Sequence, residues 1–154
     1  MNVHRKRIYN EFNSYRCKKN DSSSGILKMT LSHIETVVYF VYKNQKVTVF
    51  LNSHYPFNSP KRVVINGIDY NGKIDICKES NMYFKKYMNI NCMCCDTCLC
   101  MNNWTPTIYL IDIIDEFLLL KNTNSVINNL NVIKYNKNIP IEIIKYIRTF
   151  LLEY

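Results

Sequence analysis

The chain has 154 residues, of which 47% are hydrophobic, 21% charged and 13% aromatic, with only 3 Gly and 4 Pro. This length supports one compact core and is too short for two ordinary domains, so we expect a single domain over residues 1–154. The composition excludes collagen-like, elastic and disordered proteins, and no apolar run approaches the roughly 20 residues that cross a bilayer.

The formal net charge is +8, which alone would indicate a nucleic-acid partner. However, the sequence contains 21 Asn and 19 Ile but no Ala. This bias favours residues with AT-rich codons, Lys and Tyr among them, and an AT-rich genome explains much of the charge. A large DNA virus or an intracellular parasite would be such a source. We therefore expect a solvated basic surface without a nucleic-acid role.

The N-terminus is basic but is not followed by an apolar stretch or a small-residue cleavage site, which a secretory signal requires. We therefore expect no membrane association and a location in a reducing interior, cytoplasmic or nuclear, which would be that of the host cell if the protein is viral.

The first half of the chain changes from a helical to a strand-like pattern. Residues 3–17 place Ile8 and Phe12 four apart among charged residues, which predicts an amphipathic helix. Stretches rich in β-branched and aromatic residues, separated by breaks of hairpin length, then predict an antiparallel meander of three or four strands. These strands are expected at 26–31, 37–42, 47–51 and 62–65.

The second half is irregular before it becomes helical. Residues 68–103 have no sustained period apart from a short helix expected over 82–88, and such irregular segments tend to be functional or mobile. Thr105 as N-cap and Pro106 in the first helical position predict a helix that runs to about Lys121. An Asn-rich polar stretch to residue 138 follows, and Pro140 can start a last helix. The predicted fold class is therefore α+β.

The long predicted helix has one broad apolar side. We expect Ile111, Ile114 and Phe117 to be buried against the sheet. The acidic residues Asp112, Asp115 and Glu116 lie together on the opposite side, where we expect them to be solvated.

Three sequence motifs resemble those of the ubiquitin-conjugating enzyme (UBC) family. Residues 6–12 (Lys-Arg-Ile-Tyr-Asn-Glu-Phe) look like its opening helix, residues 55–61 (Tyr-Pro-Phe-Asn-Ser-Pro-Lys) like its Tyr-Pro-Phe-x-x-Pro loop, and residues 103–106 (Asn-Trp-Thr-Pro) like its Trp-Ser-Pro turn. The resemblance spans nearly the whole chain. It implies a UBC-like fold and a role in the transfer of ubiquitin or a ubiquitin-like modifier through a cysteine thioester to lysine.

The catalytic centre matches the family less well. The family's His-Pro-Asn tripeptide is absent, and Asp96 stands eight residues before Trp104, where the family has its nucleophilic Cys. A shift of one residue reaches Cys95, and a gap of two reaches Cys98, which is followed by Leu like the family's Cys. A second register, through Asn-Gly-Lys-Ile at 71–74, leaves Cys77 close to the family position. Cys95 is thus the first candidate nucleophile, Cys98 the second and Cys77 the third.

The cysteines also allow a metal site. Five of the seven lie within nine residues, at positions 92, 94, 95, 98 and 100. The pairs Cys92-x-x-Cys95 and Cys95-x-x-Cys98 overlap, and zinc prefers four such ligands in a tetrahedral array. A complete zinc site could use Cys92, Cys95, Cys98 and Cys100, or include Cys77.

The resemblance also implies partners. Lys6 and Arg7 would contact the activating enzyme, and a ligase would contact three residues, Phe57, Pro106 and Thr107. The alternative hypothesis is a non-enzymatic UBC-like adaptor whose altered centre binds zinc. A third hypothesis is a small zinc-stabilised nucleic-acid binder that uses the +8 charge and the tyrosines.

Overall fold

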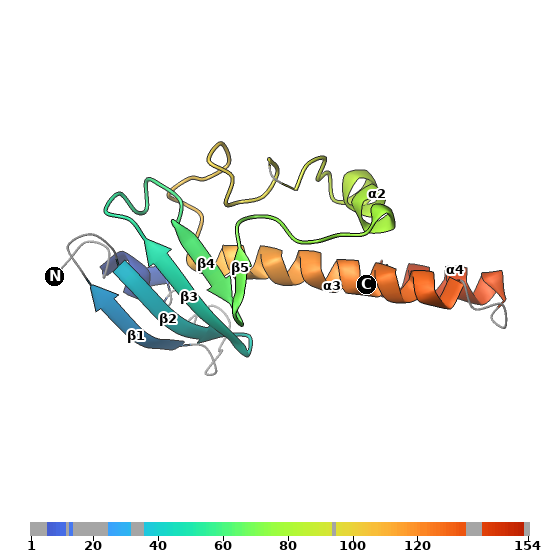
Figure 1. The fold of residues 1–154 in the computed structure, drawn as a ribbon, viewed down its shortest axis with the longest axis horizontal. Helices are drawn as coiled ribbons and strands as arrows, with labels where there is room; N and C mark the ends of the chain where they lie inside the picture. Colours follow the sequence, from blue (N-terminus) through green and yellow to red (C-terminus); the bar gives the residue numbers. More distant parts are fainter. Residues whose placement is uncertain are drawn as a thin grey trace.

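The structure, a computed structural model, describes residues 6–11, 13, 25–31, 36–93, 95–134 and 140–152. Of the predicted N-terminal helix, residues 6–11 and 13 are helical, and the rest of that prediction lies outside the described residues. The chain then forms five strands, a short helix, a long helix and a last helix (Figure 1). The predicted α+β class is confirmed.

A five-stranded sheet forms the first layer of the fold. Its strands are β1 (Gly25–Leu31), β2 (Thr36–Tyr42), β3 (Gln45–Leu51), β4 (Arg62–Ile65) and β5 (Ile68–Tyr70). They lie side by side in chain order, and each pair is antiparallel. The predicted meander is therefore confirmed, and it is longer than expected by one strand.

The additional strand β5 follows a two-residue turn. Asn66 and Gly67 both have positive φ angles, 49° and 80°, as the hairpin turns whose twist matches that of the strands require. Lys43 and Asn44, between β2 and β3, adopt the same combination, with φ of 47° and 60°. The Asn-Gly pair at 66–67 therefore reverses the chain into β5.

Three helices follow the sheet: α2 (Lys78–Tyr87), α3 (Leu110–Lys134) and α4 (Ile141–Leu152). The predicted start of the long helix at Thr105 and Pro106 is wrong, because α3 begins at Leu110. The carboxylate of Asp112 accepts a hydrogen bond from the main-chain N–H of Tyr109 at 2.8 Å, so a side chain inside the helix satisfies a group at its start.

The predicted end of the long helix at Lys121 is also wrong. α3 continues through the Asn-rich stretch, and Ile127 and Leu130 are buried there. The Asn124 side chain donates to the carbonyl of Asp75 at 3.1 Å and accepts from the N–H of Cys77 at 3.4 Å. Tertiary contacts therefore stabilise a helix that the polar composition did not predict.

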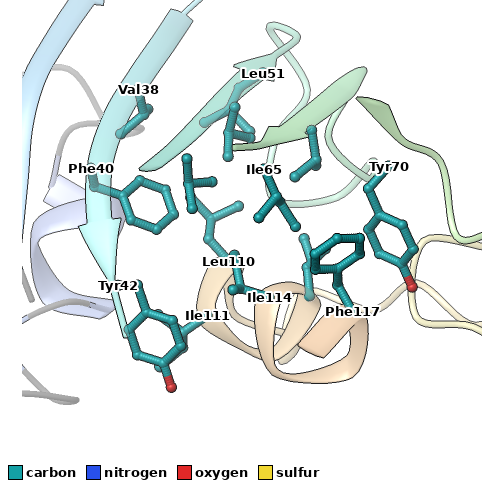
Figure 2. Close-up of a cluster of buried hydrophobic side chains, with 14 of the residues drawn as sticks. Val38, Phe40, Tyr42, Leu51, Ile65, Tyr70, Leu110, Ile111, Ile114 and Phe117 are labelled. Atoms are coloured by element: carbon teal, nitrogen blue, oxygen red, sulfur yellow. The ribbon is translucent and has the colours of Figure 1, made fainter. Parts of the chain in front are cut away.

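The core lies between the sheet and the first half of α3. Side chains that alternate along β2, β3 and β4 point to one face, as the period of two requires. Figure 2 shows these residues packed against Ile111, Ile114 and Phe117, whose exposed fractions are 7%, 0% and 2%. The predicted inward face of the helix is confirmed.

The second half of α3 extends beyond the sheet, with α2 and α4 beside it (Figure 1). Residues 71–109, which we call the connecting segment, run from β5 through α2 and return to the start of α3. Among the described residues, none of the helices is both long and apolar enough to cross a membrane.

Candidate functional site

The connecting segment returns to the sheet next to Gly72. This glycine has a φ of 84°, and a Cβ built at its position would lie 2.4 Å from Thr97 Oγ1. Thr97 is buried and also donates to the carbonyl of Met93 at 3.3 Å. Close packing of Thr97 on Gly72 thus positions the cysteines at one end of the sheet, and only glycine permits both the φ angle and the approach.

Cys98 is held by Glu116 of α3. The Cys98 N–H donates to Glu116 Oε2 at 2.8 Å, and its thiol donates to Oε1 at 3.3 Å. The hydroxyl of Tyr70 donates to the same Oε1 at 2.6 Å. Burial, and then the charge of Glu116, raise the pKa of Cys98 well above its usual range. Cys98 is therefore a poor nucleophile. Glu116 joins the loop to α3 through these hydrogen bonds.

The other carboxylates of α3 are also engaged. Asp115 accepts a hydrogen bond from the Tyr42 hydroxyl at 2.9 Å and forms an ion pair with Lys43 at 2.7 Å. Asp112, which is exposed, caps the start of α3. The expectation that all three acidic residues are only solvated is thus wrong for Asp115 and Glu116, which accept hydrogen bonds from Tyr42 and Tyr70 of the sheet.

Cys95 and Cys92 lie at the ends of one tight turn. The Cys95 N–H donates to the Cys92 carbonyl at 3.0 Å, and the Asp96 N–H donates to the same carbonyl at 3.0 Å. The Asp96 carboxylate accepts in return from the N–H groups of Asn91 and Cys92, at 2.7 and 3.0 Å. Cys95 is exposed, whereas Cys92 is half-buried. The turn therefore presents Cys95 to solvent on a loop that is fixed by four hydrogen bonds.

Asn103 and Trp104 anchor the end of this loop. The Asn103 side-chain amide donates to the carbonyls of Cys95 and Thr97, at 2.5 and 3.1 Å. The Trp104 indole N–H donates to the carbonyl of Pro56 at 2.8 Å. The Trp-Thr-Pro turn and the Tyr-Pro-Phe loop, 48 positions apart, are thus joined at one end of the domain.

A buried carboxylate joins the same two loops to the N-terminal helix. Glu11, only 3% exposed, accepts hydrogen bonds from Arg7 at 2.6 Å, the Tyr55 hydroxyl at 2.8 Å and the Leu110 N–H at 3.1 Å. Burial raises the pKa of Glu11, and the three donors oppose this effect. Arg7 also donates to the carbonyl of Pro106 at 2.6 Å. Glu11 therefore fixes the position at which α3 begins.

The predicted partner-binding residues differ in their surroundings. Phe57 is 77% exposed, an unusual environment for an aromatic side chain, and Lys6, Pro106 and Thr107 are also exposed. Arg7, by contrast, is only partly exposed, because its guanidinium pairs with Glu11.

The predicted zinc ligands have different surroundings in the structure. Within the described part of the chain, no group of three or more His, Cys, Asp or Glu residues is arranged to hold a metal ion. Cys98 is turned toward Glu116. Cys77 is the N-cap of α2, with its sulfur 3.4 Å from the donating N–H of Ser80. Cys100 is half-buried. The described residues thus separate the cysteines into different local roles.

Two clefts flank β5. The first, of about 420 Å³, lies between β4, β5 and Leu99. The second, of about 500 Å³, lies between β5, the start of the connecting segment and α3, and contains Lys73 and Lys121 together with Asp69 and Asp75. Each cleft is lined by charged residues of both signs.

Sequence patterns indicated Cys95, Phe57 and Trp104 as candidates, but not the structural roles of Glu11, Asn103 and Glu116. Each of these three side chains forms hydrogen bonds with residues that are distant in the sequence or that lie in a loop without periodicity. No local sequence pattern therefore indicates these roles. The one available signal was the place of Glu11 in a helix otherwise rich in basic residues.

Comparison with known proteins finds no matching family model, no similar curated protein and no similar solved structure.

Proposed function

We propose that this protein is a divergent UBC-like protein that carries ubiquitin or a ubiquitin-like modifier as a thioester on Cys95 and passes it to a lysine. The observation that carries the proposal is the exposure of Cys95 on an ordered turn, while the neighbouring Cys92, Cys98 and Cys100 are half-buried. A nucleophile that must meet a macromolecular thioester has to be accessible.

The arrangement of elements supports the same proposal. A helical N-terminus, an antiparallel meander and a helix after Trp104 occur in the order that the resemblance implies. The hydrogen bond from Trp104 to Pro56 connects two of the motifs that carry the resemblance. The third motif contacts both, because Glu11 accepts from Tyr55 and Arg7 donates to the carbonyl of Pro106. Fold and motifs therefore support one hypothesis, although fold alone does not establish activity.

The proposed chemistry is two acyl transfers. The Cys95 thiolate attacks the thioester carbonyl of the modifier on the activating enzyme, a new C–S bond forms, and the cysteine of that enzyme leaves as a thiolate. A lysine amine of the substrate then attacks the Cys95 thioester. The C–S bond breaks, Cys95 leaves as a thiolate, and the amine loses a proton as the isopeptide bond forms.

The second transfer lacks the asparagine of the family's His-Pro-Asn. Two N–H groups at the start of α3 are already engaged, because Asp112 accepts the N–H of Tyr109 and Glu11 that of Leu110. Loss of one oxyanion donor typically costs about 10²–10³ in rate. We therefore expect transfer to lysine to be slow compared with charging.

The test is incubation with an activating enzyme, ATP and ubiquitin. A thioester on Cys95 gives an adduct that excess thiol cleaves, and Cys95→Ser converts it to a thiol-resistant ester or abolishes it. Cys98→Ser is the matched control, three residues away, and should charge as the unmodified protein does. Charging that is lost in Cys98→Ser or Cys77→Ser, but not in Cys95→Ser, would contradict the assignment of the nucleophile.

A second candidate function is a non-enzymatic UBC-like adaptor. The observation that favours it is that Glu116 accepts hydrogen bonds from both the N–H and the thiol of Cys98. Cys98 precedes Leu99, as the nucleophilic Cys of the family precedes a Leu. This adaptor would bind the activating enzyme or a ligase without carrying a modifier, and its cysteines would bind zinc. Absence of charging with every modifier tested, together with one equivalent of zinc in the native mass spectrum of protein purified without chelator, would favour it.

A further inference from the structure

The two overlapping Cys-x-x-Cys pairs of the sequence differ in geometry. In the first, the hydrogen bond from the Cys95 N–H to the Cys92 carbonyl closes a turn in which the two cysteines are the first and last residues. Such turns hold their end Cα atoms within about 7 Å, and disulfides span Cα separations of about 4.4–6.8 Å. The Asp96 carboxylate holds the turn from the other side.

The second pair has a different environment. The Cys98 N–H donates to Glu116 instead of to the Cys95 carbonyl, and that carbonyl accepts the Asn103 side chain. The Cys98 thiol donates to Glu116 and is partly buried, and Tyr70 donates to the same carboxylate oxygen. The backbone turn therefore brings Cys92 and Cys95 close to each other, whereas Glu116 of α3 holds Cys98.

We propose that Cys92 and Cys95 form a redox modification site, which a peroxide converts to an intramolecular disulfide. The exposed Cys95 reacts first: its thiolate attacks one peroxide oxygen, an S–O bond forms, the O–O bond breaks, and hydroxide leaves. The Cys92 thiolate then attacks the sulfur of this sulfenic acid. An S–S bond forms, the S–O bond breaks, and a second hydroxide leaves. The two thiols are oxidised and the peroxide is reduced.

The turn explains why this reaction should outcompete further oxidation. Sulfenic acids are resolved by a nearby thiol, and low loop-closure cost favours a partner that the backbone already holds close. The consequence for activity rests on the proposed function: a disulfide at Cys95 would block charging reversibly, and reduction would restore it.

The experiment oxidises the full chain with hydrogen peroxide, alkylates the remaining thiols and measures mass. Disulfide formation removes two alkylatable thiols and about 2 Da, and dithiothreitol reverses both changes. Cys92→Ser should instead leave a sulfenic acid on Cys95 that dimedone captures, and Cys95→Ser should form no disulfide. Cys98→Ser is the matched control and should lose two thiols as the unmodified protein does. Circular dichroism of each variant verifies its fold.

The proposal is overturned if Cys98→Ser prevents the disulfide while Cys92→Ser does not. It is also overturned if dimedone labels Cys95 equally in the unmodified protein and in Cys92→Ser, because Cys92 would then resolve nothing. These readouts use no ubiquitin and no activating enzyme. A disulfide without charging would refute the proposed function alone, and charging without a disulfide would refute the redox site alone.

Discussion

The sheet with the first half of α3 and the connecting segment are held in place by different interactions. The first region buries a continuous apolar cluster, whose members Val38, Leu51, Ile65 and Leu110 are fully enclosed. Among the described residues of the connecting segment, Phe84 and Trp104 are the buried hydrophobic side chains. Hydrogen bonds that Glu116 and Asp96 accept and that Asn103 donates provide much of the remaining order. From this comparison we expect the first region to determine the free energy of unfolding and the second to determine the reactivity of the cysteine thiols.

The largest expected effect is in the apolar region. Phe117→Ala should lower the free energy of unfolding by about 3–5 kcal/mol, because it leaves a large cavity between the helix and the sheet. Leu119→Ala is the matched control on the same helix, since Leu119 is 54% exposed, and should change it by less than about 0.5 kcal/mol. Urea unfolding followed by circular dichroism measures both. A loss below about 1 kcal/mol for Phe117→Ala would contradict the position of the core.

The two glycines with positive φ that flank β5 test where the regions meet. Gly67→Ala should lower the free energy of unfolding by about 1–2 kcal/mol, because the backbone there is left-handed. No atom lies within 4 Å of the added Cβ, so no steric cost is added. Gly72→Ala should cost more, about 2–3 kcal/mol, because Thr97 must also move. Thermal unfolding of the two variants measures the difference. Equal losses would show that Thr97 does not pack on Gly72.

The buried carboxylate of the N-terminal helix gives the next effect. Glu11→Gln should lower the free energy of unfolding by about 1–3 kcal/mol, because an amide cannot accept from all three donors that face Glu11. Asp69→Asn is the control, because the Arg62–Asp69 pair is about half exposed on both sides and should contribute at most about 1 kcal/mol. Denaturant titration of both variants measures these values. Equal effects would mean that Glu11 is not the buried junction.

The smallest effect on global stability is expected in the connecting segment, where a change in reactivity is larger. Glu116→Gln removes a charge that raises the pKa of Cys98, so a larger fraction of Cys98 is thiolate at a fixed pH near 8. Its rate of alkylation by iodoacetamide should therefore increase, while that of Cys95 stays the same. Peptide mass spectrometry at successive times measures both rates. An increase at Cys95 alone would contradict the contact between Cys98 and Glu116.

Local patterns in the sequence predicted the α+β class, β1 to β4 and the inward face of α3. These features depend on apolar residues that recur every two positions in strands and every 3.6 positions in helices, and such a pattern can be recognised within a short stretch of sequence. The pattern did not predict β5, because Ile68–Tyr70 is too short to have a period of its own.

The boundaries of α3 and the roles of the cysteines depended on tertiary structure. Glu11, far away in the sequence, satisfies the N–H at the start of α3, and burial of Ile127 and Leu130 extends the helix through polar residues. The sequence contains two equivalent Cys-x-x-Cys spacings, and only the folded chain distinguishes them, because Glu116 and Asn103 take the hydrogen-bonding groups of the second pair. Such contacts join residues that no local pattern connects, so their energy appears only when the chain has folded.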